Sequence, residues 1–173
     1  MRRTAMKTAL TGMCVALAMI FSYVEVLLPP ISAAFPGIKF GLANVVIVFV
    51  LYRFGAIRAI TVSFLRVFLV FLLFHGNVVY LAYSIAGALL SLAVMLLLKH
   101  THLFSHMAVS AVGGVAHNAG QILMAMFLLG VAEIGYYLPV LAVTGCVFGG
   151  IIGLLGGIAE RRVPHFPFEE DVS

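Results

Sequence analysis

Apolar residues fall into six runs that short polar, glycine or proline segments separate. The runs cover residues 6–28, 40–52, 57–74, 78–98, 107–129 and 136–159. They are apolar on every face and lack the alternation of barrel strands, so they predict helices. A membrane-spanning helix needs roughly 20 apolar residues, and only the second run is clearly short. The pattern predicts an all-α integral membrane protein, with a six-transmembrane-helix bundle in residues 1–160 and a polar cytoplasmic tail at 161–173.

Composition supports lipid as the main solvent of this chain. Apolar residues make up 64% of it and charged residues 9%, against roughly 45–50% and about 25% in soluble domains. The net charge is +4, but the ten Lys and Arg residues are dispersed in ones and twos. They form no basic patch, so we expect no nucleic-acid partner.

The basic residues instead predict orientation. If there are six spans, nearly all the span-flanking basic residues fall on one side of the membrane, and Lys39 falls on the other. Lys and Arg concentrate in cytoplasmic loops, so both termini should be cytoplasmic, in a multi-pass protein of the bacterial cell membrane. The residues on the predicted cytoplasmic side are Arg2, Arg3, Lys7, Arg53, Arg58, Lys99, Arg161 and Arg162.

Arg66 is the one basic residue that lies within a predicted span and not at its end. It lies nine residues into the third run, ~14 Å from the cytoplasmic end of a helix and close to the membrane midplane. A charged group at this depth is costly and needs a partner or a ligand. We therefore predict that Arg66 contacts an anionic substrate. A structural ion pair with Glu25 is the alternative.

Further polar residues are expected at similar or more outward depths. His117 and Gln121 share one face of the fifth helix, with Asn118 beside them. Asn44 and Glu25 lie near the outer ends of the second and first helices. Together with Arg66 these side chains predict a polar pocket open to the outside. Asn, Gln and His can also simply join helices, and Glu25 has Lys39 as a second candidate partner.

The sequence does not indicate catalysis, a bound cofactor or a metal. It has no acidic motif suited to magnesium and no nucleophile with a spaced base. No second His or Cys stands at ligand spacing from His117. His100, His102 and His106 form a loose group in a cytoplasmic connection, which we interpret as interfacial polar residues.

Two helices carry stripes of small residues, which allow close backbone contact in membranes. The stripe on the sixth helix should pack within the bundle. The stripe on the first helix can dock on another helix of this chain, which the sequence alone favours, or on a partner. The two stripes are Gly145, Gly149, Gly153 and Gly157, and Ala5, Ala9, Gly12 and Ala16.

Five short motifs occur in order along the predicted helices. They are KFGLAN at 39–44, LRV at 65–67, YSIAG at 83–87, HNAGQ at 117–121 and YLP at 137–139. In this order they resemble the Gx transporter family, also labelled heptaprenyl diphosphate synthase component I, over roughly residues 5–160. That family is similar to the substrate-binding (S) components of energy-coupling factor (ECF) transporters, which are six-helix membrane proteins.

The resemblance implies a function and partners. An S component binds a vitamin or cofactor and works with a transmembrane coupling subunit and two cytoplasmic ATPases. A small-residue stripe on its first helix docks on the coupling subunit. A flavin nucleotide is the best guess for the substrate. Lys39 and Arg66 fit its phosphate, and Tyr80, Tyr83 and Tyr137 fit its ring. A membrane accessory subunit of prenyl diphosphate synthesis and a structural scaffold remain alternatives.

Overall fold

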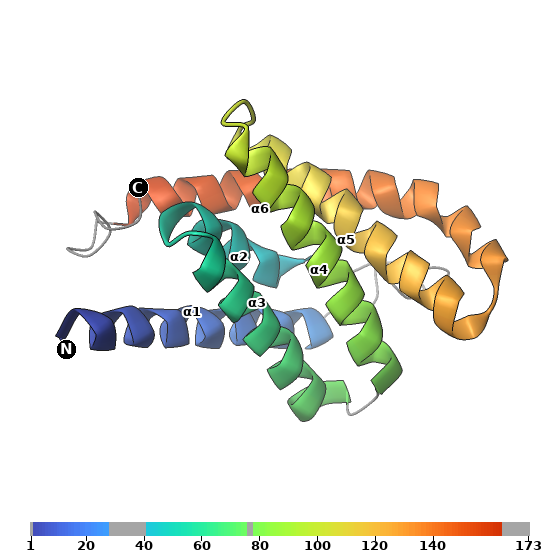
Figure 1. The fold of residues 1–173 in the computed structure, drawn as a ribbon, viewed down its shortest axis with the longest axis horizontal. Helices are drawn as coiled ribbons and strands as arrows, with labels where there is room; N and C mark the ends of the chain where they lie inside the picture. Colours follow the sequence, from blue (N-terminus) through green and yellow to red (C-terminus); the bar gives the residue numbers. More distant parts are fainter. Residues whose placement is uncertain (1, 28–40, 76–77, 164–173) are drawn as a thin grey trace.

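The computed structural model describes residues 2–27, 41–75 and 78–163, and these form a bundle of α-helices (Figure 1). No strand occurs in the described ranges. A π-helical turn, Phe71–His75, extends α3, and a 3₁₀-helix, Ala132–Tyr137, precedes α6. The all-α prediction is therefore confirmed. The six α-helices are α1 (Arg2–Leu27), α2 (Leu42–Arg53), α3 (Ala56–Val70), α4 (Val78–His100), α5 (His106–Leu129) and α6 (Leu138–Arg162).

Five of these helical segments are long and apolar enough to cross a membrane: Ala5–Glu25, Ala56–Leu73, Val78–His100, His106–Leu129 and Ala132–Arg162. The helix ends differ slightly from the apolar runs. α1 begins at Arg2, because a helix continues through charged residues that a hydropathy pattern excludes. α6 begins at Leu138 with Pro139 in its first turn, where proline lacks only an N–H that would have no partner anyway.

α2 is the short helix of the bundle and lies at its centre, between α1 and α6 (Figure 1). Its 12 residues extend only about 18 Å, which is less than the thickness of the hydrocarbon layer. Most of its side chains are buried, and the core around them draws on every other helix. Representative core residues are Ile47 and Leu51 of α2, Ala18 of α1, Val62 of α3, Met95 of α4, Val109 of α5 and Ile152 of α6.

α5 packs between α4 and α6 through glycines. A Cβ atom on Gly114 of α5 would clash with the backbone carbonyl of Gly145 on α6. A Cβ on Gly149 would lie 2.5 Å from the Ser110 carbonyl oxygen, and one on Gly153 would lie 2.6 Å from that of His106. The prediction that the α6 stripe packs within the bundle is confirmed. Such contacts matter because lipid-exposed helices gain little by burying apolar area alone.

The ends of α2, α4 and α6 meet at one end of the molecule, which we call the basic end. Arg53 at the end of α2 donates to the carbonyls of Glu160 in α6 and of Val163 just after it, and Lys99 at the end of α4 donates to the Leu51 carbonyl of α2. The first turns of α1 lie at the same end (Figure 1). This grouping agrees with the predicted sidedness of the basic residues. The assignment of this end to the cytoplasm stays a prediction.

A candidate anion site where α1, α2 and α3 meet

Arg66 lies in the membrane-spanning part of α3 and is partly buried. Its Nε atom is buried and has no hydrogen-bond partner within the described ranges. A guanidinium donates through a fixed planar fork, so a buried Nε–H without an acceptor leaves part of that capacity unused. Arg66, which the sequence places near the membrane midplane, thus has an Nε–H group without an acceptor in the described structure.

Glu25, near the end of α1, brings three helices together. Its Oε1 accepts a hydrogen bond of 2.8 Å from the backbone N–H of Leu42 at the start of α2. Its charge also acts on the Arg66 guanidinium of α3. The negative carboxylate stabilises both the positive end of α2 and the arginine. Of its two candidate partners, Arg66 is close enough to interact, while Lys39 lies outside the described residues.

The first turn of α2 places Asn44 at the same junction. The backbone N–H of Asn44 donates to the carbonyl of Gly41 at 2.7 Å. Gly41 has a φ of 72°, which favours glycine. A Cβ there would lie 3.0 Å from Ile152 of α6 and 3.3 Å from the Asn44 amide nitrogen. The turn therefore requires glycine for its conformation and for the close approach of α6.

The polar residues of α5 face two different neighbours. His117 and Gln121 both pack against Gly87 of α4, where a Cβ would lie 3.0 Å from His117 Cε1 and 2.9 Å from Gln121 Cγ. Asn118 instead donates a 2.6 Å hydrogen bond to the Leu141 carbonyl of α6. The shared face of His117 and Gln121 is confirmed. Asn118 joins two helices, and the convergence of all three residues on Arg66 stays a prediction.

The candidate ring-binding tyrosines lie toward the surface. Tyr80 and Tyr83 of α4 form an edge-to-face pair with ring centroids 6.4 Å apart. Tyr80 and Tyr137 are exposed, and Tyr83 is partly buried. The structure thus joins Tyr80 to Tyr83, and Tyr137 is the last residue of the 3₁₀-helix.

A comparison with known protein families matches the part of the chain that contains these residues. The sequence model of heptaprenyl diphosphate synthase component I matches residues 14–158. The chain belongs to this family. No curated protein and no solved structure matches it. The matched region runs from α1 to α6 and includes Arg66, Glu25 and Asn44.

At the basic end, Arg53 is buried, although its position in the sequence indicates only a residue that flanks a span. The Arg53 side chain is 4% exposed and lies 3.9 Å from the Glu160 carboxylate. Its NH1 and NH2 atoms donate to the carbonyls of Glu160 and Val163 at 3.3 and 3.1 Å. The sequence did carry a signal for this burial, namely the shortness of the second apolar run. Arg53 ends the short helix α2 and therefore lies inside the bundle.

Lys99 has a similar role at the end of α4. Its Nζ donates to the Leu51 carbonyl at 2.6 Å and lies 5.2 Å from the centroid of the Tyr52 ring. The Tyr52 ring in turn packs on His106 of α5, with centroids 3.8 Å apart. These contacts hold α2, α4 and α5 together at the basic end.

The small-residue stripe of α1 is open. Ala5, Ala9, Gly12 and Ala16 are all exposed, and a Cβ on Gly12 would have no neighbour within 4 Å. Packing of this stripe within the chain, which the sequence alone favoured, is therefore wrong for the described residues. The opposite face of α1, with Cys14, Val15 and Ala18, supplies the contacts to the core.

No group of three His, Cys, Asp or Glu side chains in the described part of the chain is arranged to hold a metal ion. The rings of His100 and His102 lie 6.5 Å apart, and His106 packs on Tyr52.

Proposed function

We propose that this chain is the membrane-embedded substrate-binding subunit of an ECF-type transporter for an anionic vitamin or cofactor. The observation that carries the proposal is the buried Nε of Arg66, which has no hydrogen-bond partner in the described structure. Arginine recognises phosphate and carboxylate groups through paired hydrogen bonds. A phosphate-bearing substrate would supply the acceptor that this Nε–H lacks.

Glu25 supports this assignment. Its carboxylate compensates the charge of Arg66, while one of its oxygens is already engaged by the Leu42 N–H. Charge compensation lowers the cost of keeping an arginine in the membrane before substrate arrives. Asn44, one turn into α2, and His117 and Gln121 on α5 are proposed as further substrate contacts, with Lys39, Asn118, Tyr83 and Tyr137.

The partner surface is proposed to be the α1 stripe. Exposed alanines and a glycine allow another helix to approach closely, and the structure leaves the stripe uncovered. The proposed occupants are the transmembrane coupling subunit and, through it, two cytoplasmic ATPases.

The family name supports a second candidate, a membrane accessory subunit of heptaprenyl diphosphate synthesis. A prenyl diphosphate would also satisfy Arg66. The sole aspartate of the chain is Asp171, so a magnesium-binding aspartate motif would have to come from another subunit. The two candidate functions differ in the partner subunits they require and in the anionic ligand that Arg66 would bind.

A pair of flavins tests the substrate proposal. Flavin mononucleotide and riboflavin differ by one phosphate, and binding of each quenches flavin fluorescence. We expect the detergent-purified protein to prefer the mononucleotide and the Arg66→Gln variant to lose that preference. A preference that persists in folded Arg66→Gln contradicts the role of Arg66. If neither flavin binds, mass spectrometry of the small molecule retained on purification decides between a vitamin and a prenyl diphosphate.

A matched pair of substitutions tests the partner proposal. Ala9→Leu adds bulk to the α1 stripe, and Ala93→Leu makes the same change at an exposed alanine of α4. We expect Ala9→Leu to abolish co-purification of the coupling subunit and ATPases and to leave ligand binding intact, while Ala93→Leu changes neither. Co-purification of a soluble prenyltransferase in their place supports the synthase candidate.

A further inference from the structure

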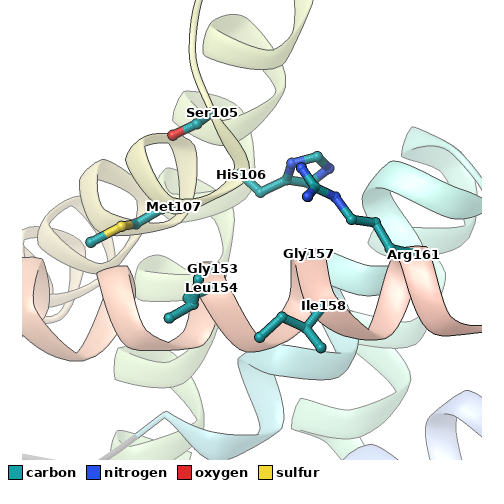
Figure 2. A pocket seen from close by; sticks show the side chains of 8 residues that line it. All are labelled: Ser105, His106, Met107, Gly153, Leu154, Gly157, Ile158 and Arg161. Carbon is teal, nitrogen blue, oxygen red and sulfur yellow. The ribbon is translucent and has the colours of Figure 1, made fainter.

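A second cationic site lies apart from Arg66, where α5 begins beside the last turns of α6. A shallow pocket of about 150 Å³ opens there (Figure 2). Its polar end is formed by His106 and Arg161, and Ser105 also lines the pocket, on the side of Met107 (Figure 2). Figure 2 shows the Arg161 side chain reaching toward the His106 ring, and the charge of Arg161 acts on that ring.

The start of α5 adds donors to this polar end. Ser105 caps the helix by accepting the Ala108 N–H at 3.3 Å. The N–H groups of His106 and Met107 belong to the first turn and have no acceptor within the helix. Together with the helix dipole they favour an anion. The nearby carboxylate of Glu160 also acts on His106, but it is paired with Arg53.

The rest of the pocket is apolar and faces outward. Gly157 lies at its floor, Gly153 lines it where α6 packs on the backbone of α5, and Met107, Leu154 and Ile158 form its walls. The three wall side chains are 53%, 53% and 46% exposed, so in a membrane they contact acyl chains. The pocket therefore combines a cationic end at the basic end of the bundle with an apolar groove that continues into the hydrocarbon layer.

We propose that this pocket binds one anionic phospholipid. Its phosphate would contact Arg161 and the first turn of α5, and the start of an acyl chain would lie along Met107, Leu154 and Ile158. Basic pockets between helices at the cytoplasmic side of membrane proteins bind anionic headgroups in this way. A free phosphate would use the cationic end but would leave the apolar groove empty, so the groove favours the lipid.

Lipid titration of the detergent-purified full chain, followed by native mass spectrometry, tests this. Phosphatidylglycerol and phosphatidylcholine with the same acyl chains are the probes, with inorganic phosphate as the third. We expect a tightly bound phosphatidylglycerol and weaker phosphatidylcholine. Arg161→Gln should weaken phosphatidylglycerol binding about fivefold, the usual effect of one basic side chain near an anionic headgroup.

Arg162→Gln is the matched control, because it removes the same charge one residue along α6 from an exposed side chain that does not line the pocket. It should leave the affinity unchanged. Gly157→Leu fills the floor without changing charge, and its Cβ meets His106 only at an ordinary 3.4 Å; it should also weaken lipid binding. Equal effects of Arg161→Gln and Arg162→Gln overturn the proposal, because they indicate general surface attraction. Competition by inorganic phosphate at the lipid's own concentration also overturns it.

Discussion

Arg53, which is buried, and Arg66, which is partly buried with a buried Nε, lie on neighbouring helices and differ in their hydrogen-bond partners. Arg53 at the basic end donates to two carbonyls of α6 and lies beside the Glu160 carboxylate. Arg66 in α3 has the charge of Glu25 nearby, but its Nε donates to no acceptor in the described ranges. The difference indicates that Arg53 holds helices together, whereas Arg66 retains capacity for a ligand.

The physical basis of this comparison is the cost of a buried donor. A buried polar group without a partner costs about 1–3 kcal/mol, and more when it is charged. Backbone carbonyls at the end of a helix lack intrahelical donors. The carbonyls at the end of α6 therefore accept hydrogen bonds from Arg53, and both the carbonyls and the guanidinium gain partners. Arg66 lies against the middle of the bundle, where helix carbonyls are already bonded.

The largest effect is expected for Arg53→Met. Removing the guanidinium leaves two α6 carbonyls and Glu160 without their donor, so we expect the free energy of unfolding to fall by about 3 kcal/mol. Thermal or denaturant unfolding in detergent measures it. Arg58→Met is the control, because Arg58 is only partly buried and donates to Phe54 at a long 3.4 Å. If Arg53→Met lowers the free energy of unfolding no more than Arg58→Met does, Arg53 does not hold the helices together, and the proposed difference from Arg66 is wrong.

Arg66→Gln should act mainly on binding. We expect the affinity for the phosphate-bearing ligand to fall by about 2–3 kcal/mol, and Arg66→Lys to cost about 1–2 kcal/mol, because lysine keeps the charge and loses the planar fork. Ligand affinity and unfolding are measured on the same preparation. An Arg66→Gln variant that unfolds readily but keeps its ligand affinity would instead assign Arg66 to a structural ion pair with Glu25.

Glu25→Gln tests the same comparison by removing the carboxylate that lies near Arg66. It removes a charge-assisted acceptor from the Leu42 N–H and should lower the free energy of unfolding by about 1–2 kcal/mol. It also removes the competing negative charge at Arg66, so the affinity for an anionic ligand should rise. Weaker binding in the folded variant would show that the carboxylate contacts the ligand itself.

Lys99→Met is expected to have the smallest effect. It loses one hydrogen bond to Leu51 and a cation–π contact with Tyr52, which together contribute about 1 kcal/mol to stability. Ligand affinity should not change, because these contacts lie at the basic end. A change in affinity at constant stability would indicate that the two ends of the bundle are coupled.

Sequence alone determined the elements of this protein. The six apolar runs correspond to the six helices, because a chain in lipid must satisfy its backbone within each helix. The breaks fall at glycines and charged residues, such as Gly55 and Gly130, whose φ values of 87° and 66° a side chain would strain. The unusual depth of Arg66 and the glycine stripe of α6 were also visible, because helical periodicity places residues along one axis.

Tertiary structure decided where each of those residues points. The rotation of a helix about its own axis follows from packing with its neighbours, which hydropathy does not encode when every face is apolar. Packing turned Asn118 toward α6, left the small-residue stripe of α1 uncovered and brought Glu25 to Arg66 across a long separation in sequence. It also drew Arg53 inward, because α2 is too short to carry its last residue out of the bundle.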